Sequence, residues 1–384
     1  MTRVAVNRTV LMWALERSGK TAVLQEKFPD IQRWQKGERQ PTVRQLESLA
    51  KATFTPLGYF FLSKPPEDRL PIPHFRTAKD GPIFRPSPHL IEIVHTMERR
   101  QAWMREHLIE QGREQLPFVG SASLNDKPHS VAQMMREALG ITEEWASKQP
   151  NWTGALVELR RRTERAGIIV VVSGIVGNNT QRKISPAEFR GFVLVDGYAP
   201  LIFVNGADAK AAQMFTLAHE IAHIWLGKSA AFDLRNMQPA EDKYEKACNE
   251  IAAEFLVPED GLIKFWPSGS RESGRFAAVA RYFKVSELVA ARRALDLGLI
   301  EGREFFSFCK AYQESELRRA SGQTEGGDFY ATQNLRLGVS FASAVVRAAK
   351  EGKLSYREAY QLTGLYGNSF ERYARTISPA AGSW

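Results

Sequence analysis

Cysteine and long apolar runs are both scarce in this chain of 384 residues. Its two cysteines, Cys248 and Cys309, are too few for a disulfide scaffold and suit a reducing, cytoplasmic location. No run reaches the roughly 18 consecutive apolar residues of a membrane helix, and no such run follows the N-terminus. We therefore expect a cytoplasmic protein with no membrane span, no secretory leader and no membrane partner.

The overall composition is that of an ordinary globular protein. Hydrophobic residues make up 43% of the chain and charged residues 25%, and the length is sufficient for two or three domains with a sizeable core. The formal net charge of +9 permits contact with nucleic acid or with an acidic protein. The charge alone does not decide between these two kinds of partner.

The most informative short motif is H-E-x-x-H at residues 219–223. Residues four apart lie on one face of a helix, so His219 and His223 can bind one zinc ion, while Glu220 can hold and deprotonate a zinc-bound water. The flanking segment 214–227 is apolar nearly all round and predicts a buried helix. Burying unpartnered ionisable groups there would be costly, and a metal would remove that cost. The alternative is a chance match, expected in roughly 1% of chains of this length.

The helix predicted next along the chain, over residues 242–257, carries three carboxylates that compete for the role of third zinc ligand: Glu245, Glu250 and Glu254. We favour Glu245, because Asn249 lies four residues later and can brace a ligand histidine from the same face. Glu250 and Glu254 form a separate pair at the same spacing, for which a solvated helix face is the alternative. Cys248 is expected to be a small core residue.

Four segments of this region each resemble sequences of a known family: residues 199–205, 213–220, 245–249 and 252–258. They resemble the ImmA/IrrE family of zinc metallopeptidases, over roughly residues 150–260. The resemblance implies a gluzincin-like fold, with Zn²⁺ held by His219, His223 and Glu245, and with Glu220 as general base. It also implies a regulatory partner, since family members cleave or help to inactivate a repressor or another regulator.

Residues 1–62 are predicted to form a small all-helical unit with helices at 9–17, 21–28, 31–36 and 42–52. The string at 33–42 resembles the helix-turn-helix of the xenobiotic-response-element (XRE) type, which implies reading of the DNA major groove. The stretch between Gly19 and Trp34 is about five residues shorter than in that motif, and Pro29-Asp30 stands where base-reading residues would lie. We therefore expect protein docking or weak DNA contact rather than sequence-specific reading.

The whole chain is predicted to be α+β and mostly helical, in four parts: an XRE-like helix-turn-helix domain at 1–62, a Pro-rich linker at 63–88, a zinc metallopeptidase domain at 89–265 and a helical C-terminal extension at 266–384. In the peptidase domain we expect helices at 88–112, 131–139 and 153–166, a buried strand at 167–172, and a hairpin from 189–195 and 201–204. In the extension we expect helices at 276–282, 286–295 and 304–314, one long helix at 329–350, and another at 355–362.

Two classes of function follow. The first is a zinc endopeptidase that cleaves a regulatory protein, with Tyr244 and His74 as candidates for stabilising the oxyanion. The second is an antitoxin or repressor-like binding protein that neutralises a partner encoded nearby, for example a PIN-type nuclease toxin, and uses the peptidase fold as a docking scaffold. The intact H-E-x-x-H motif favours the enzyme, whereas the shortened N-terminal unit and the helical tail favour partner binding as a second activity.

Overall fold

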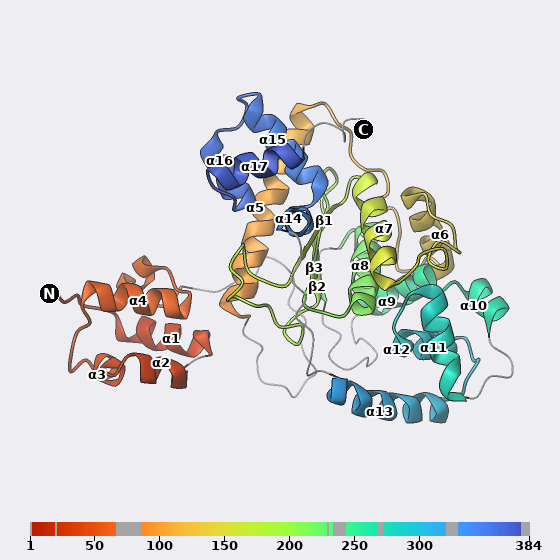
Figure 1. Cartoon of the computed structure of the whole chain (residues 1–384), viewed down its shortest axis with the longest axis horizontal. Coiled ribbons are helices and arrows are strands. Elements are labelled where there is room, and N and C mark those ends of the chain that lie inside the picture. The colour runs from red at the N-terminus through yellow and green to blue at the C-terminus, as the bar shows by residue number, and fades with distance from the viewer. Residues whose placement is uncertain are drawn as a thin grey trace. The chain divides into compact units, whose positions relative to one another are not determined.

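The computed structural model describes residues 2–19, 21–66, 86–228, 230–232, 243–266, 272–319 and 329–377 (Figure 1). The chain divides into two compact units, one made of residues 1–71 and 76–95, the other of residues 72–75 and 96–384. Most of the predicted Pro-rich linker, together with His74, lies outside the described residues. Among the helices that are described, none has the length and apolar character needed to cross a membrane.

The first unit contains the four predicted helices and a short 3₁₀ helix: α1 (Arg8–Ser18), α2 (Thr21–Lys27), α3 (Ile31–Lys36), α4 (Val43–Thr53) and η1 (Leu57–Phe61). Asn7 caps α1 by accepting a hydrogen bond from the Thr9 amide at 2.9 Å, and Thr42 forms a capping box with Gln45 at the start of α4. These helices bury a compact apolar cluster that includes Leu11, Leu15, Trp34, Leu46, Leu49 and Phe60.

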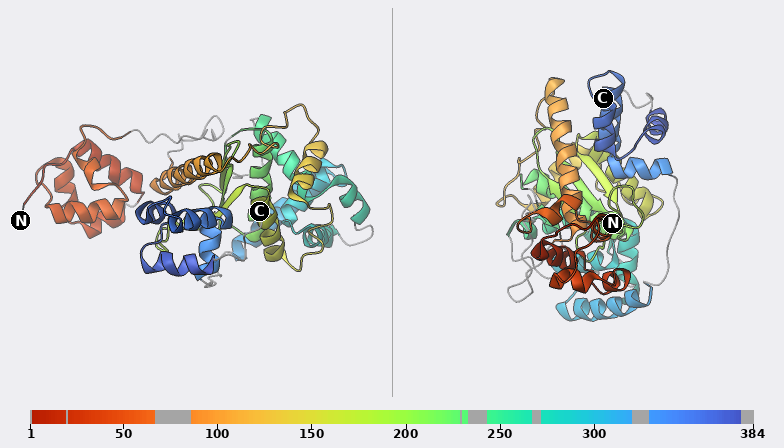
Figure 2. Two further views of the ribbon diagram at one scale, coloured as in Figure 1. Left: turned by 90° about the horizontal axis from the view of Figure 1, so that it is seen from above. Right: turned by 90° about the vertical axis from the view of Figure 1, so that its left-hand side faces the viewer.

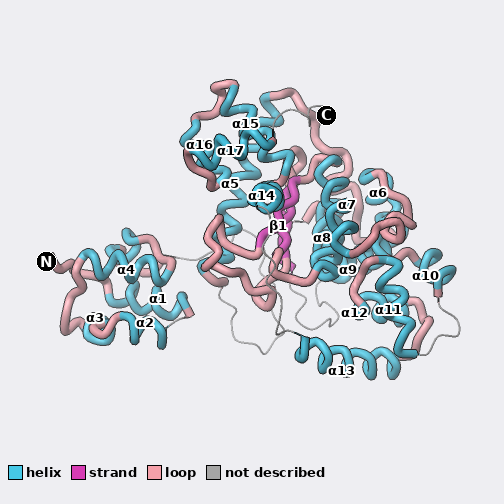
Figure 3. The backbone as a smooth tube through the Cα atoms, viewed as in Figure 1, coloured by secondary structure: helices cyan, strands magenta, loops and turns pink. Residues whose placement is uncertain are grey.

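The second unit is built on a four-stranded sheet, whose strands are magenta in Figure 3. Their order across the sheet is β1-β3-β2-β4. Its strands are β1 (Ile169–Ser173), β2 (Gly191–Leu194), β3 (Leu201–Asn205) and β4 (Ala230–Phe232). β1 and β3 are parallel, while β2 pairs antiparallel with both β3 and β4. Every residue of β1, β2 and β3 is buried, as their β-branched and aromatic composition predicts. The predicted hairpin is present, and β4 is an additional edge strand that the sequence did not predict.

Helices lie on both sides of this sheet, as Figures 1 and 2 show for α8 and α5. The helices beside the strands are α5 (Pro88–Glu110), of which residues 96–110 belong to this unit, α6 (Pro128–Leu139), α7 (Trp152–Arg165), α8 (Lys210–Trp225) and α9 (Lys243–Leu256). The central one is α8, which packs against β2, β3 and β4 on one side and against α6, α7 and α9 on the other. It is buried without interruption from Gln213 to Trp225. The structure thus confirms the buried helix that the apolar pattern predicted.

Eight further helices are seen in the described part of the unit: α10 (Glu259–Phe265), α11 (Glu272–Phe283), α12 (Glu287–Asp296), α13 (Gly302–Arg319), α14 (Phe329–Leu337), α15 (Val339–Lys350), α16 (Tyr356–Thr363) and α17 (Asn368–Thr376). The prediction of one long helix over 329–350 was wrong. Gly338 has a φ of 77° and interrupts it, and Glu164 accepts the first free amide of α15, that of Val339, at 2.9 Å. Neither α10 nor α17 was predicted.

Candidate metal centre

The residues of the H-E-x-x-H motif lie in the last two turns of α8, inside the second unit. His219 and Glu220 are fully buried, and His223 is 1% exposed. The helix ends just before Gly227, which has a φ of 68°, and the Lys228 amide donates to the carbonyl of His223. The apolar flanks therefore place three ionisable groups between the sheet and α9.

The two histidines meet Glu245, which comes from the first turn of α9. Their Nε2 atoms are 3.1 Å apart. The Glu245 carboxylate bridges them, with Oε2 at 3.2 Å from Nε2 of His219 and Oε1 at 3.1 Å from Nε2 of His223. The structure thus brings together the three residues that the sequence singled out as zinc ligands.

Burial and pairing set the protonation of this cluster. Burial lowers the pKa of His219 to about 4, although Glu245 opposes the shift. Burial alone would raise the pKa of Glu245, but hydrogen bonds from the two histidines outweigh it and lower the pKa to about 2. A neutral imidazole and an ionised carboxylate are the forms that bind a divalent cation.

Glu220 lies in a different environment from Glu245. Burial and, to a smaller extent, the charge of Glu245 hold the pKa of Glu220 well above its usual value. Neither carboxylate oxygen of Glu220 has a hydrogen-bond partner among the described residues. Gly191 in β2 makes room for it, because a Cβ at this position would lie 3.2 Å from Oε1 of Glu220 and 2.5 Å from Cγ2 of Thr216. A buried carboxyl group with no partner is the kind of group that serves chemistry rather than stability.

Two further side chains of α9 lie near the histidines. Asn249 raises the pKa of His219, but by less than Glu245 does. Its Oδ1 makes no hydrogen bond to a described residue. Cys248 is fully buried in the apolar core, as expected. The sequence did not predict a position near the metal ligands for Cys248. The structure places donor atoms of His219, His223 and Cys248 within 4.8 Å of one another. The spacing of three residues between Glu245 and Cys248 could have indicated this, since such residues share a helix face.

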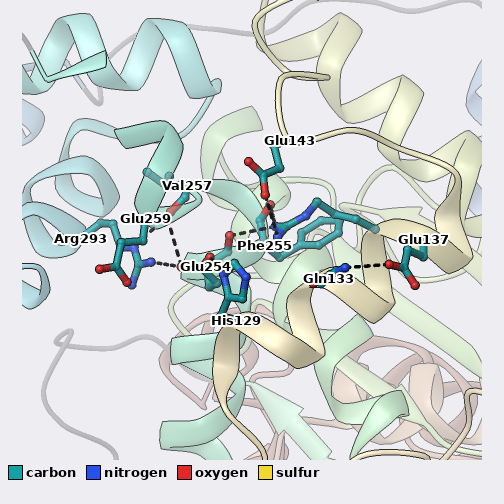
Figure 4. A network of polar contacts seen from close by, with 10 residues as sticks. His129, Gln133, Glu137, Glu143, Glu254, Phe255, Val257, Glu259 and Arg293 are labelled. Carbon is teal, nitrogen blue, oxygen red and sulfur yellow. Dashed lines mark hydrogen bonds and ion pairs between the residues drawn. The ribbon is translucent and has the colours of Figure 1, made fainter. Parts of the chain in front are cut away.

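The competing carboxylates of α9 do not join the cluster. Glu250 is exposed and pairs only loosely with Lys246, at 3.9 Å, as a solvated face predicts. That interpretation is wrong for Glu254, which is 2% exposed. Glu254 accepts hydrogen bonds from the guanidinium of Arg293 and from Nδ1 of His129, the latter at 3.0 Å, within the separate network of Figure 4.

The two candidates for stabilising an oxyanion remain without structural support. Tyr244 precedes Glu245 and is partly buried, and its ring faces the amine of Lys228 at 5.0 Å from the ring centroid. His74 lies outside the described residues. The candidates for metal binding and proton transfer, in contrast, all lie on α8 and α9.

Comparison with known families agrees with this geometry. Residues 164–295, which include the whole cluster, match the Peptidase_M78 family model, described as the IrrE N-terminal-like domain, whose members are typically zinc-dependent. The match begins and ends later than the segment 150–260 predicted from the sequence. Residues 337–376 match a domain of unknown function, DUF8813. Both matches lie outside residues 1–62, so the helix-turn-helix resemblance stays a prediction. No curated protein matches the chain.

Proposed function

We propose that this chain is a zinc-dependent endopeptidase-type regulator of the ImmA/IrrE kind, with a gluzincin-like core, that cleaves or inactivates a partner repressor or regulatory protein. The convergence of His219, His223 and Glu245 beside the buried carboxyl group of Glu220 carries this proposal. The match of residues 164–295 to a peptidase family supports it.

The donors fit a zinc ion. Two imidazoles and one carboxylate are the ligand set of many catalytic zinc sites. Two nitrogens bound tetrahedrally to zinc lie about 3.3 Å apart, given Zn–N bonds of about 2.0–2.1 Å, and the two Nε2 atoms are already 3.1 Å apart. When bound, zinc would supply Lewis-acid chemistry by lowering the pKa of water and by polarising the scissile carbonyl.

Glu220 is the proton carrier in this proposal. Its raised pKa suits a group that accepts a proton from the attacking water and then passes it to the leaving amine. Asn249 acts as a positioning residue that orients His219. Glu245 would hold the metal and so fix its distance from Glu220.

The substrate is proposed to bind as an extended segment. Among the described strands, β4 is the last one on the side of β2, and it packs against α8. Such an edge can receive an extended peptide as an additional strand. This mode favours an unstructured stretch of a protein substrate, which agrees with an endopeptidase.

The experiment compares wild type with Glu220→Gln in a cleavage assay on casein and on the protein encoded beside this chain's gene. We expect cleavage that a chelator stops, and a loss of about 10²–10⁴-fold in Glu220→Gln with zinc content unchanged. His223→Ala should lose both zinc and cleavage. A Glu220→Gln protein that performs every function of wild type would favour the docking scaffold of an antitoxin instead.

A further inference from the structure

The thiol of Cys248 lies close to the candidate metal ligands. Cys248 stands one turn after Glu245, on the face of α9 that packs against α8, and it is fully buried. Donor atoms of Cys248, His219 and His223 lie within 4.8 Å of one another. Three potential ligands from two helices therefore surround one small volume, while the Glu245 carboxylate contacts the two histidines but is not part of this donor group.

The distances allow a bond from sulfur to a metal ion. In a tetrahedral zinc site with Zn–N bonds of about 2.0–2.1 Å and a Zn–S bond of about 2.3 Å, donor atoms lie about 3.3–3.6 Å apart. The upper limit of 4.8 Å between the donor atoms of Cys248, His219 and His223 exceeds that range by about 1.2–1.5 Å. A side-chain rotation on this scale needs no movement of the helix backbone.

We propose that Cys248 is a direct ligand of the metal, so that His219, His223, Glu245 and Cys248 form a closed set of four protein donors. This inference rests on the zinc site of the proposed function and adds a ligand to it. On binding, the thiol loses its proton to solvent and its sulfur forms the bond to the metal. The sequence alone predicted only a core residue at this position.

Charge balance in a buried site favours this donor set. A divalent cation bound by two neutral histidines and one carboxylate keeps a charge of +1, which burial disfavours. A thiolate brings the charge of the ion and its four ligands to zero, with the neighbouring Glu220 carboxyl group protonated. Because zinc sites with four protein ligands have no position left for water, the thiolate-bound form is a resting state that must release the sulfur before it can act on a substrate.

The other cysteine provides a matched control. Cys309 lies on α13 and packs against a separate apolar cluster around Phe276 and Phe305. It is not part of the donor group around His219 and His223. Sulfur signals that come from the metal site should therefore depend on Cys248 and not on Cys309.

The test is zinc-edge X-ray absorption on the full-length, zinc-loaded protein. We expect a sulfur scatterer at about 2.3 Å in wild type and in Cys309→Ser, and its loss in Cys248→Ala. A wild-type spectrum with only nitrogen and oxygen scatterers at about 2.0–2.1 Å would overturn the proposal while leaving the zinc site of the proposed function intact. A wild-type protein that binds no zinc would overturn both.

A competition titration with a zinc chelator gives a second measurement. Loss of a direct ligand should weaken zinc binding in Cys248→Ala by at least about tenfold, since even residues outside the ligand shell commonly contribute that much. Cys309→Ala should bind zinc as wild type does. Equal zinc affinity in the two alanine variants would contradict direct ligation by Cys248.

Discussion

The two ends of α9 each bury a carboxylate, but they surround it differently. At the C-terminal end, Glu254 has a guanidinium from Arg293, an imidazole from His129 and the backbone amide of Glu259. At the N-terminal end, Glu245 has two histidines, and its neighbour Glu220 has no hydrogen-bond partner in the described part of the chain. A buried charge with a complete set of partners is a structural element, whereas an incomplete set indicates chemistry.

The largest effect on stability that we predict comes from removing the charge of Glu254, the carboxylate with a complete set of partners. Glu254→Gln should lower the free energy of unfolding by about 3–5 kcal/mol, because it leaves the buried guanidinium of Arg293 without its counter-charge. Denaturant titration followed by tryptophan fluorescence measures the change. Glu250→Gln is the exposed control on the same helix and should change stability by no more than about 0.5 kcal/mol.

Glu220→Gln sharpens this contrast in the same titration. It removes a carboxyl group that pairs with nothing described, so its effect on stability should be far smaller than that of Glu254→Gln. Equal losses in the two variants would mean that Glu220 also has a structural role.

Glu164 is buried with fewer partners than Glu254 but more than Glu220. We predict that it makes the stability of the protein depend on pH. Burial raises its pKa to about 7, although Arg160 and a hydrogen bond from the Val339 amide favour the charged form. The folded state then keeps a proton that the unfolded state has lost, so stability falls as pH rises from 4.5 to about 7. The shift of about 2.5 pKa units corresponds to a loss of up to about 3 kcal/mol.

The matched measurement is the unfolding free energy of wild type and Glu164→Gln across this pH range. Only their difference is informative, because other groups titrate there too, His219 among them. The difference should grow in favour of the variant as pH rises. A difference that does not change with pH would show that Glu164 keeps the same charge in the folded and unfolded states.

Zinc should raise the free energy of unfolding through the ligand at the N-terminal end of α9. A substitution of the exposed Glu250 on the same helix should not change this gain. At free zinc of about 100 times the dissociation constant, binding adds about 2.7 kcal/mol to the unfolding free energy. Glu245→Gln should lose most of this gain, whereas Glu250→Gln should keep it. The same denaturant titration, with and without zinc, measures it. A full zinc effect in Glu245→Gln would exclude this carboxylate as a ligand.

Local spacing explains which of these features the sequence could predict. His219 and His223 share a helix face whatever surrounds them, and Glu245 with Asn249 repeats that spacing on the next helix. The burial of Glu254 depends instead on Arg293 and His129, which lie 39 and 125 residues away along the chain. After the break at Gly338, the amide of Val339 donates to Glu164, 175 residues earlier in the chain. Contacts across such separations leave no trace in a local pattern.

The smallest effect concerns the N-terminal unit, where most of the described charged side chains are exposed. We predict weak, salt-sensitive DNA binding without sequence preference, with a dissociation constant on the order of 10⁻⁴–10⁻⁶ M. The helix that would read bases, α3, has only six residues, and it buries Ile31 and Trp34. At its start, Asp30 pairs with Arg39 at 2.7 Å and with Arg33 at 3.5 Å. The basic side chains at this end thus already have a carboxylate partner, which would itself repel phosphate.

Fluorescence polarisation of the full chain on random and upstream DNA, across a salt series, measures this binding. The affinity for both DNAs should fall together as salt rises, because released counterions supply the driving force. Asp30→Asn should strengthen binding to both equally by removing the repulsion, while Glu47→Gln on α4 controls for the change in net charge. Nanomolar binding to one sequence at physiological salt would show that α3, despite its length, reads bases in the groove.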